Sequence, residues 1–284
     1  MFRILLLCLA FAHPVLAAET PSHRVEMPDG RWFRIDLPDQ AAGAPIILGL
    51  HGGGGNPDQF ARNSGLSQAA VEAGYAVIYP AGTGRTRLLT WNGGYCCGYA
   101  ARQGVDDVAF LDTVVARAAQ QFGLDGDRVY VTGMSNGSIM AERYAALRPG
   151  AVRAVAGVAG TLDPAVRPLG GVPLLHIHGT ADEMVPYAGG QGSGLTDTDF
   201  APVESTMAAF AAAWPQPLTE VQGTSIDAAG GPLRQRDWRD AEGRPVVRLV
   251  TIEGGGHVWP GGRRADGTGP DATAMILRFF ARYP

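Results

Sequence analysis

The chain has 284 residues, of which 46% are hydrophobic and 18% are charged, so it can bury a full core. Its formal net charge is −4, and no basic cluster with interleaved aromatic residues occurs, which argues against nucleic acid as a partner. Lysine is absent, so all 23 basic side chains other than histidine are arginine. This absence excludes a serine–lysine dyad, a Schiff-base lysine and a phosphate-binding loop of the Walker type.

The first residues have the pattern of a secretory signal peptide. Arg3 gives a basic start, an apolar stretch follows from Ile4 to Ala12, and small residues end the segment at Ala17. The apolar stretch is too short to span a bilayer, and no later segment is long and apolar enough. We therefore expect a signal peptide over residues 1–17 and one domain over residues 18–284. The protein is expected to be secreted or periplasmic, without a membrane partner.

The rest of the chain alternates between strand and helix patterns, starting with a hairpin turn at Pro28-Asp29-Gly30. The predicted strands cover residues 23–27, 32–36, 46–50, 76–79, 129–131, 155–158, 174–177 and 246–252. Apolar spacings of three and four predict helices over 108–122, 139–147, 205–214 and 276–280. Glycine-rich residues 188–194 and 223–231 predict surface loops. The alternation indicates an α/β fold with a single doubly wound, mostly parallel sheet and helices on both faces.

The segment Gly133-Met134-Ser135-Asn136-Gly137 carries the most specific signal in the chain. It follows a β-branched run over residues 128–132 and precedes the helical pattern that begins at Ile139. Glycines allow a sharp turn from strand to helix where side chains would clash, and such a turn exposes its serine. In this context Ser135 is predicted to be a catalytic nucleophile.

His257 is the predicted base for Ser135. A serine hydroxyl needs a base within hydrogen-bond reach, and the base needs an orienting carboxylate. Three histidines follow Ser135 in the sequence, namely His176, His178 and His257. Only His257 lies in a glycine-rich loop after the last predicted strand, at the carboxyl end of the sheet where a base is expected. The alternative is an exposed loop histidine without a catalytic role.

Asp182 is the predicted carboxylate, because it lies on the loop that follows the predicted strand 174–177. Asp163, which follows the preceding strand, is the main alternative. Glu183 is adjacent to Asp182 but is expected to point elsewhere. A turn-capping role is the structural alternative for Asp182, since aspartate is common in turns.

Backbone N–H groups near the nucleophile are expected to bind an oxyanion. One is predicted to come from Asn136, the residue after the serine, and the other from the glycine-rich loop after strand 46–50. Gly53 is the first choice in that loop, and Gly52 and Gly54 are the alternatives, because the sequence does not fix the register of the loop. A flexible surface loop is the structural alternative. A phosphate cradle is less favoured, because neither lysine nor the required glycine spacing follows.

Two tryptophans are candidates for the wall of a substrate cleft. Trp259 is two residues from His257, so its apolar ring is predicted to lie near the site. Trp91 is a weaker candidate, and a packing role suits it as well. His176 and His178 share one strand face and could hold a metal ion, but a third histidine or a cysteine is not close in sequence. One packed histidine and one that anchors a loop are therefore favoured, and no metal is predicted.

The mature chain keeps two adjacent cysteines, Cys96 and Cys97. In an oxidising compartment they are expected to form a disulfide. Adjacent Cα atoms are ~3.8 Å apart across a trans peptide, below the usual disulfide separation of ~4.4–6.8 Å. Such a bond would stiffen its turn. The alternative is two separate thiols, one of them buried.

Six segments together give the chain a family resemblance. They are Leu50-His51-Gly52-Gly53-Gly54-Gly55, Cys96-Cys97-Gly98, Val105-Asp106-Asp107-Val108, Gly133-Met134-Ser135-Asn136-Gly137, Gly179-Thr180-Ala181-Asp182 and Gly256-His257-Val258-Trp259-Pro260-Gly261. In this order the chain resembles the secreted polyhydroxybutyrate depolymerase and feruloyl esterase-type family of α/β hydrolases. The resemblance implies an α/β-hydrolase fold, the triad Ser135, Asp182 and His257, no cofactor, and a cleft for esters of hydroxyacids or plant-wall aromatic acids. The Cys-Cys-Gly segment also matches members of that family.

The leading hypothesis is therefore a secreted serine esterase that forms an acyl-enzyme on Ser135. Its ester would be a hydroxyalkanoate oligomer or polyester, or a feruloyl or acetyl ester of plant polysaccharide. The chain shows no linker with a separate polymer-binding module, which favours soluble oligomers or small esters. Two alternatives are a catalytically silent exported binding protein that uses the same cleft, and a serine peptidase of the same fold. The sequence specifies neither the natural ester nor the oligomeric state.

Overall fold

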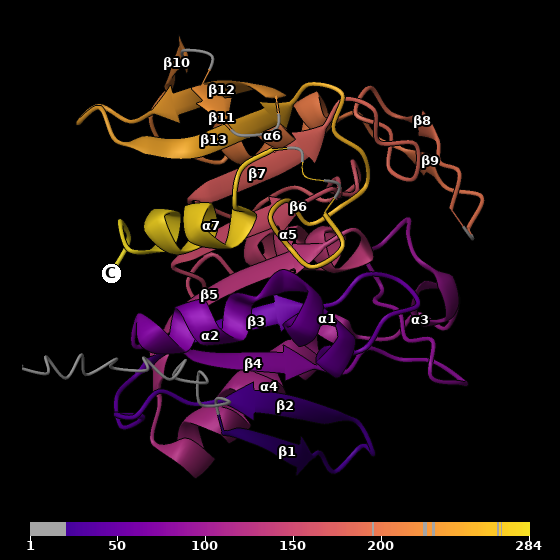
Figure 1. Cartoon of the computed structure of the whole chain (residues 1–284), viewed down its shortest axis with the longest axis vertical. Helices are drawn as coiled ribbons and strands as arrows, with labels where there is room; N and C mark the ends of the chain where they lie inside the picture. Colours follow the sequence, from indigo (N-terminus) through magenta and orange to yellow (C-terminus); the bar gives the residue numbers. More distant parts are fainter. Residues whose placement is uncertain (1–20, 195, 224–225, 229–230, 266, 268) are drawn as a thin grey trace, which may run out of the picture.

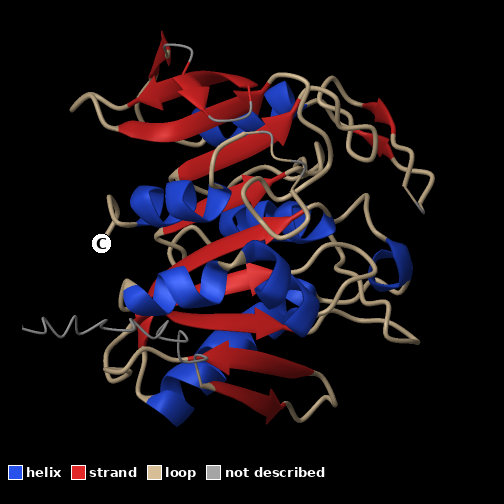
Figure 2. Ribbon diagram, in the orientation of Figure 1, coloured by secondary structure: helices blue, strands red, loops and turns tan. Residues whose placement is uncertain are grey.

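The structure is a computed structural model that describes residues 21–284, apart from 195, 224–225, 229–230, 266 and 268. The predicted signal peptide, residues 1–17, lies outside the described residues. An eleven-stranded sheet runs through the molecule, and helices cover both of its faces (Figures 1 and 2). Among the described residues, every helix falls short of the length and apolar character that a membrane span requires.

The centre of the sheet consists of parallel strands, and its two edges are antiparallel. The central strands, in spatial order, are β4 (Ala76–Pro80), β3 (Pro45–Leu50), β5 (Asp125–Met134), β6 (Ala154–Val158), β7 (Leu174–Gly179) and β13 (Pro245–Ile252). The edges are β2 (Trp32–Asp36) and β1 (Ser22–Glu26) on one side, and β12 (Gly231–Arg239), β10 (Thr219–Gln222) and β11 (Ile226–Ala228) on the other. The prediction of an α/β fold with a mostly parallel, doubly wound sheet is confirmed.

Two sets of helices cover the sheet. One face packs against α1 (Pro57–Ser64), α2 (Leu66–Glu72) and α7 (Ala272–Phe280), and the other against α4 (Asp107–Phe122), α5 (Asn136–Leu147) and α6 (Val203–Ala212). Successive side chains of β3 alternate between these two cores, with Ile46 and Leu48 in one and Ile47 in the other. Burial on both faces explains why the central strands are apolar without an alternating pattern.

Short elements gather at the carboxyl ends of the parallel strands, on the right of Figure 1. They are α3 (Gly98–Arg102), β8 (Gly190–Gln191) and β9 (Asp199–Phe200). The carboxyl ends of β3, β5, β7 and β13 all meet at this edge, because parallel strands run in one direction. Loops that leave these strands can therefore bring residues that are distant in sequence to one site.

The structure differs from the sequence prediction mainly in short and peripheral elements. The helices α1, α2 and α3 were not predicted, because five to eight residues are too few for a clear apolar period. The prediction of a loop over residues 223–231 is wrong in part, since β11 and the first residue of β12 lie there. The predicted loop 188–194 contains the two-residue strand β8. β11 forms by pairing with β12 of the large sheet, and β8 forms by pairing with β9 in a separate two-stranded sheet. Local composition does not reveal these backbone hydrogen bonds.

Candidate active site

Ser135 lies at the sharp turn between β5 and α5. Its backbone has φ 57° and ψ −127°, a positive φ that is strained for a residue with a side chain. The Ser135 N–H donates to the Val158 carbonyl at 2.8 Å. A side chain on Gly133 would collide with the Gly137 backbone, and one on Gly137 would collide with the Leu50 carbonyl. Both elbow glycines are therefore required by close backbone contacts, as well as by the turn itself.

The predicted acid and base are hydrogen-bonded to each other. His257 Nδ1 lies 2.7 Å from Asp182 Oδ2. The other carboxylate oxygen, Oδ1, accepts the N–H groups of Met184 at 2.9 Å and Val185 at 2.8 Å. Burial alone would raise the pKa of Asp182, but hydrogen bonds from His178, His257 and the backbone outweigh burial and lower it. Asp182 is therefore held as a carboxylate that orients the His257 ring.

The loops that carry Asp182 and His257 are bound to each other along their backbones. The Thr180 N–H donates to the Ile252 carbonyl at 2.9 Å, and the Ala181 N–H donates to the Gly255 carbonyl at 2.9 Å. A side chain on Gly179 would collide with the Gly255 carbonyl group and come within 3.0 Å of its Cα. This close approach extends the parallel β7–β13 pairing into the site and fixes the acid relative to the base.

The glycine-rich loop after β3 borders the same turn. Gly54 N–H donates to the Leu89 carbonyl at 2.8 Å, and Gly55 N–H donates to the Gly52 carbonyl at 3.0 Å. In the part of the chain that the structure describes, the N–H groups of Gly52 and Gly53 make no hydrogen bond. A Cβ added to Gly53 would lie 3.5 Å from Asn136 Cβ. Gly54, which the sequence left open, already has an acceptor, so Gly52 and Gly53 remain as candidate oxyanion donors.

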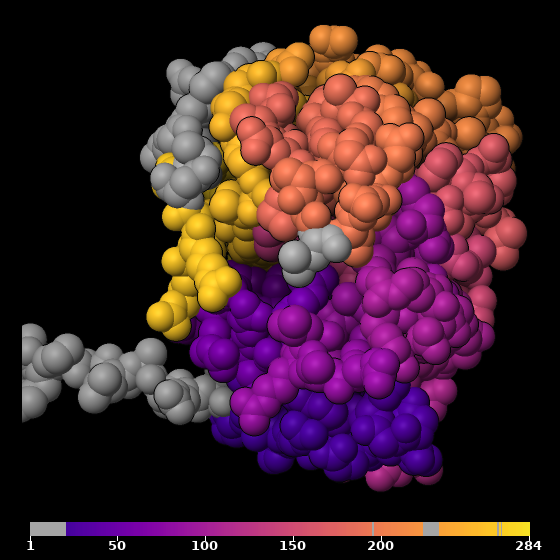
Figure 3. Space-filling view, turned by 90° about the vertical axis from the view of Figure 1, so that its right-hand side faces the viewer, coloured from indigo at the N-terminus to yellow at the C-terminus, as the bar shows by residue number. Residues whose placement is uncertain are grey.

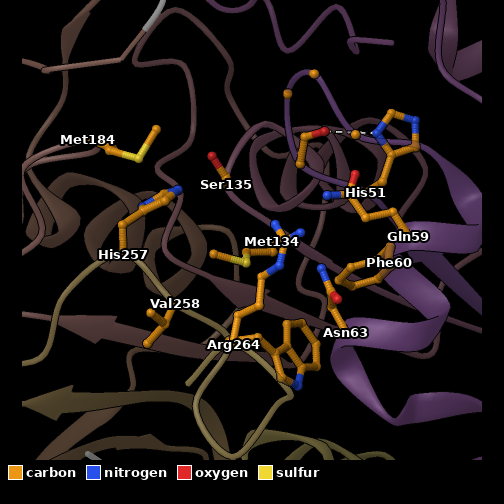
Figure 4. Close-up of a pocket in the computed structure, with 15 residues that line it drawn as sticks. His51, Gln59, Phe60, Asn63, Met134, Ser135, Met184, His257, Val258 and Arg264 are labelled. Carbon is orange, nitrogen blue, oxygen red and sulfur yellow. Dashed lines mark hydrogen bonds between the residues drawn. The ribbon is translucent and has the colours of Figure 1, made fainter. Parts of the chain in front are cut away.

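His51 supports this loop from behind. The Gly82 N–H donates to His51 Nε2 at 3.1 Å, so the proton of the neutral ring is on Nδ1, which donates to the Gly52 carbonyl at 2.8 Å (dashed in Figure 4). Burial, with a contribution from the Arg31 charge, lowers the pKa of His51 to about 4. Sequence reasoning missed this role. The available signal was a histidine placed directly before a run of glycines.

Trp91 does not line the cavity, and the structure contradicts the prediction that it contacts substrate. Its side chain is 0% exposed, and its indole Nε1 donates to the His51 carbonyl at 3.0 Å. The Trp91 N–H donates to Asn136 Oδ1 at 2.7 Å, and Asn136 Nδ2 donates to the Trp91 carbonyl at 2.9 Å. Trp91 therefore supports the turn and the glycine-rich loop from the interior, which is the packing alternative that the sequence allowed.

A cavity of about 450 Å³ opens over Ser135 and His257. Figure 3 shows the edge of the molecule where it lies, between violet segments and yellow-to-orange ones. Its lining consists of His51, Gly52, Gly53, Gly54, Gly55, Gln59, Phe60, Asn63, Met134, Ser135, Met184, His257, Val258, Trp259 and Arg264. Trp259 is among them, packed edge-on against Phe60 with ring centroids 5.3 Å apart.

The His257 ring is directed toward the Ser135 side chain (Figure 4). Within the described residues no hydrogen bond joins the Ser135 and His257 side chains. In structures without substrate such a catalytic hydrogen bond is often long, and it tightens when substrate binds.

The alternative site residues are engaged elsewhere. Asp163 accepts the N–H groups of Tyr95 at 3.1 Å and Ala165 at 2.8 Å, and Glu183 is exposed. His176 Nε2 lies 3.1 Å from His178 Nδ1, so the two histidines bind each other. Within the described ranges no group of three or more histidine, cysteine, aspartate or glutamate side chains could hold a metal ion.

The adjacent cysteines lie beside the acid loop. Their sulfur atoms are in contact across a cis peptide bond. Cys96 is 1% exposed and packs in a small apolar cluster with Ile139 of α5 and Val185. The pair therefore supports the wall behind the cavity rather than the cavity itself.

Comparison with known proteins assigns the chain to a family. The family model described as "Esterase PHB depolymerase" matches residues 33–166. The chain is 32% identical over 270 residues to NocK of Nocardia uniformis subsp. tsuyamanensis, a protein assigned as an esterase, covering 87% of this chain and 73% of NocK. The chain belongs to the PHB depolymerase esterase family. As a member of this family it is an esterase that acts on carboxylic esters.

Other relatives are longer than the region they share with this esterase. It is 25% identical over 225 residues to feruloyl esterase B of Piromyces equi, covering 75% of this chain but 39% of that enzyme. Among solved structures, the acetyl xylan esterase from Aspergillus awamori has a TM-score of 0.60 at 16% identity, covering 92% of this chain and 99% of that one. TT1662 from Thermus thermophilus has a TM-score of 0.59 at 20% identity, covering 93% and 98%. These structures share the α/β-hydrolase fold.

The pKa of His51 predicts a pH dependence of stability. Between pH 6.5 and about pH 4 the unfolded chain binds a proton at His51 that the folded chain does not. The free energy of unfolding should therefore fall as the pH falls through this window, by up to about 1.4 kcal/mol per pH unit from this group. Urea denaturation of wild type and His51→Gln between pH 6.5 and pH 4 measures this change in the free energy of unfolding. If the free energy of unfolding depended on pH identically in the two proteins, the lowered pKa of His51 would be contradicted.

Proposed function

We propose that this esterase uses Ser135 as its nucleophile through an acyl-enzyme, with His257 as base and Asp182 as orienting acid. The observation that carries the proposal is the 2.7 Å bond between His257 Nδ1 and Asp182 Oδ2, with the imidazole facing an elbow serine in one cavity. The chain order serine, aspartate, histidine is the one expected for this fold. No cofactor enters the proposed reaction.

The geometry supports a two-step ester hydrolysis. The Ser135 hydroxyl attacks the ester carbonyl while His257 Nε2 takes its proton, and the N–H groups of Gly53 and Asn136 bind the oxyanion. His257 then protonates the leaving alkoxide, which departs as the alcohol. Water attacks the acyl-enzyme in the same way and releases the acid and free Ser135. Throughout, the Asp182 carboxylate stabilises the imidazolium that forms.

We propose hydroxyalkanoate oligomers or polyester, and feruloyl or acetyl esters of plant polysaccharide, as the substrate classes. Phe60, Met134, Met184 and Trp259 give the cavity an apolar wall that suits an aromatic or alkyl group. Relatives include enzymes named for feruloyl and acetylxylan esters. The cavity volume of about 450 Å³ is large enough for a substituted phenyl acyl group.

We also propose that the protein is exported and that Cys96 and Cys97 are disulfide-bonded in the mature chain. The basic start and apolar stretch of residues 1–17 support export. The two cysteines are adjacent in the sequence, and an oxidising compartment favours a disulfide between them.

Replacement of Ser135 tests the nucleophile. Ser135→Ala should lower the hydrolysis rate of p-nitrophenyl acetate by at least about 10³-fold, because no other group on the turn can form the acyl-enzyme. The two proteins are compared after circular dichroism shows that both are folded. Equal rates would show that Ser135 is not the nucleophile.

Replacement of Met184 tests the apolar wall. Its side chain lines the cavity beside His257, is 43% exposed, and can be truncated without loss of its backbone bond to Asp182. Met184→Ala should raise KM for methyl ferulate or a hydroxybutyrate oligomer by a few-fold and leave KM for an acetyl ester unchanged. A change of equal size for every ester would argue against an acyl-group contact.

Alkylation tests the disulfide. The denatured mature protein should take up no iodoacetamide at Cys96 or Cys97 until a reductant is added, as measured by intact mass. The Cys97→Ser variant provides the control, because its single thiol should react without reductant. Two adducts on the unreduced wild-type protein would contradict the bond.

A further inference from the structure

A buried chain of hydrogen bonds lies behind Asp182. Glu142 Oε1 is 2.7 Å from His176 Nδ1, and His176 Nε2 is 3.1 Å from His178 Nδ1. His178 Nε2 is 2.8 Å from the Val185 carbonyl oxygen and 3.4 Å from Asp182 Oδ2. The side chains of Glu142, His176 and His178, here called the buried network, are at most 1% exposed.

The buried network joins two elements of the site. Glu142 belongs to α5, the helix that begins directly after Ser135. His176 and His178 share one face of β7, their rings stacked with centroids 5.3 Å apart, and the loop after β7 carries Asp182. The network therefore links the nucleophile helix to the acid loop through side chains alone.

The donors and acceptors of the buried network fix its proton count. The Val185 carbonyl can only accept, so His178 Nε2 carries a proton. Burial lowers the pKa of His178, which leaves its Nδ1 as an acceptor for the proton on His176 Nε2. The remaining pair, His176 Nδ1 and Glu142 Oε1, then shares one proton. The network is neutral overall, and each of its bonds has one donor and one acceptor.

One carboxylate oxygen of Glu142 has no partner in the described part of the chain, whereas the other binds His176. Its Oε2 atom is buried without a hydrogen-bond partner among the described residues, which destabilises the folded chain. An apolar side chain of similar volume at this position on α5 would remove that oxygen, but it would also leave His176 Nδ1 unpaired. The specific contact of Glu142 is therefore its bond to His176, which orients that ring.

We propose that Glu142, His176 and His178 are positioning residues that hold Asp182 in place for His257. The His178 Nε2–H faces both Asp182 Oδ2 and the Val185 carbonyl, so the orientation of this ring fixes the carboxylate and its loop together. Glu142 fixes that ring through His176. None of the three lines the cavity, so they act through Asp182 and not on substrate. The proposal rests on the proposed role of the triad.

Two substitutions of Glu142 and one control separate positioning from packing. Glu142→Gln keeps a donor for His176 Nδ1, whereas Glu142→Leu fills the space and leaves that atom unpaired. Tyr144→Phe is the control, because it removes one partly buried hydrogen bond from the same helix, to Asp112 at 2.9 Å, outside the network. Glu142→Leu should lower kcat by about tenfold or more with KM unchanged, as for other supporting partners of a site residue. Glu142→Gln and Tyr144→Phe should keep kcat within a few-fold of wild type.

A spectroscopic readout makes the test independent of turnover. The proton between His257 Nδ1 and Asp182 Oδ2, 2.7 Å apart, should give a far-downfield proton NMR signal in wild type, Glu142→Gln and Tyr144→Phe. In Glu142→Leu this signal should broaden or move upfield. Unchanged kcat and signal in Glu142→Leu, or an equal loss in Glu142→Gln, would overturn the proposal. If instead Ser135→Ala matches wild type, the proposed function fails while the signal still reports on the network.

Discussion

The strained turn at Ser135 is the constraint on which the rest of the site depends. A positive φ at a residue with a side chain persists only where several contacts from neighbouring residues hold it in place. Here β6 binds the Ser135 N–H through the Val158 carbonyl, and the end of β3 presses its backbone against Gly137. The same β3 end continues into the glycine-rich loop, so the contact that holds the turn also places the oxyanion donors beside it.

Buried polar groups complete this arrangement, and they do so as neutral histidines. His51 accepts from Gly82 and donates to Gly52, which fixes the loop on one side of the serine. His178 is fixed in the same manner on the other side, next to Asp182. A neutral imidazole can donate and accept at once, which an ammonium group or a carboxylate cannot do. A charged ring at either position would lose one of these bonds and carry a buried charge.

The residues that sequence reasoning located are those with a local signal. Ser135 lies in a pattern whose glycines are required by the turn, and Asp182 and His257 follow strands whose ends share one edge of the sheet. The place of Trp91 was not predictable, because an aromatic residue in a loop has the same sequence signal whether it faces a cavity or the core. Glu142 gave no signal, since its partners come from β7 and helical periodicity does not report tertiary neighbours. The fold class followed from the central strands and the first hairpin from its turn signal, whereas β10, β11 and β12 lacked a clear apolar pattern in the sequence.

The backbone contact between Gly179 and Gly255 has a consequence for how this site can diversify. It leaves no room for a Cβ on Gly179, so the seam that joins the acid and base loops does not tolerate a larger residue at that position. Side chains such as Met184 and Val258 line the cavity without belonging to this seam. New ester preferences in this scaffold should therefore arise by exchange of such side chains, while the seam stays constant.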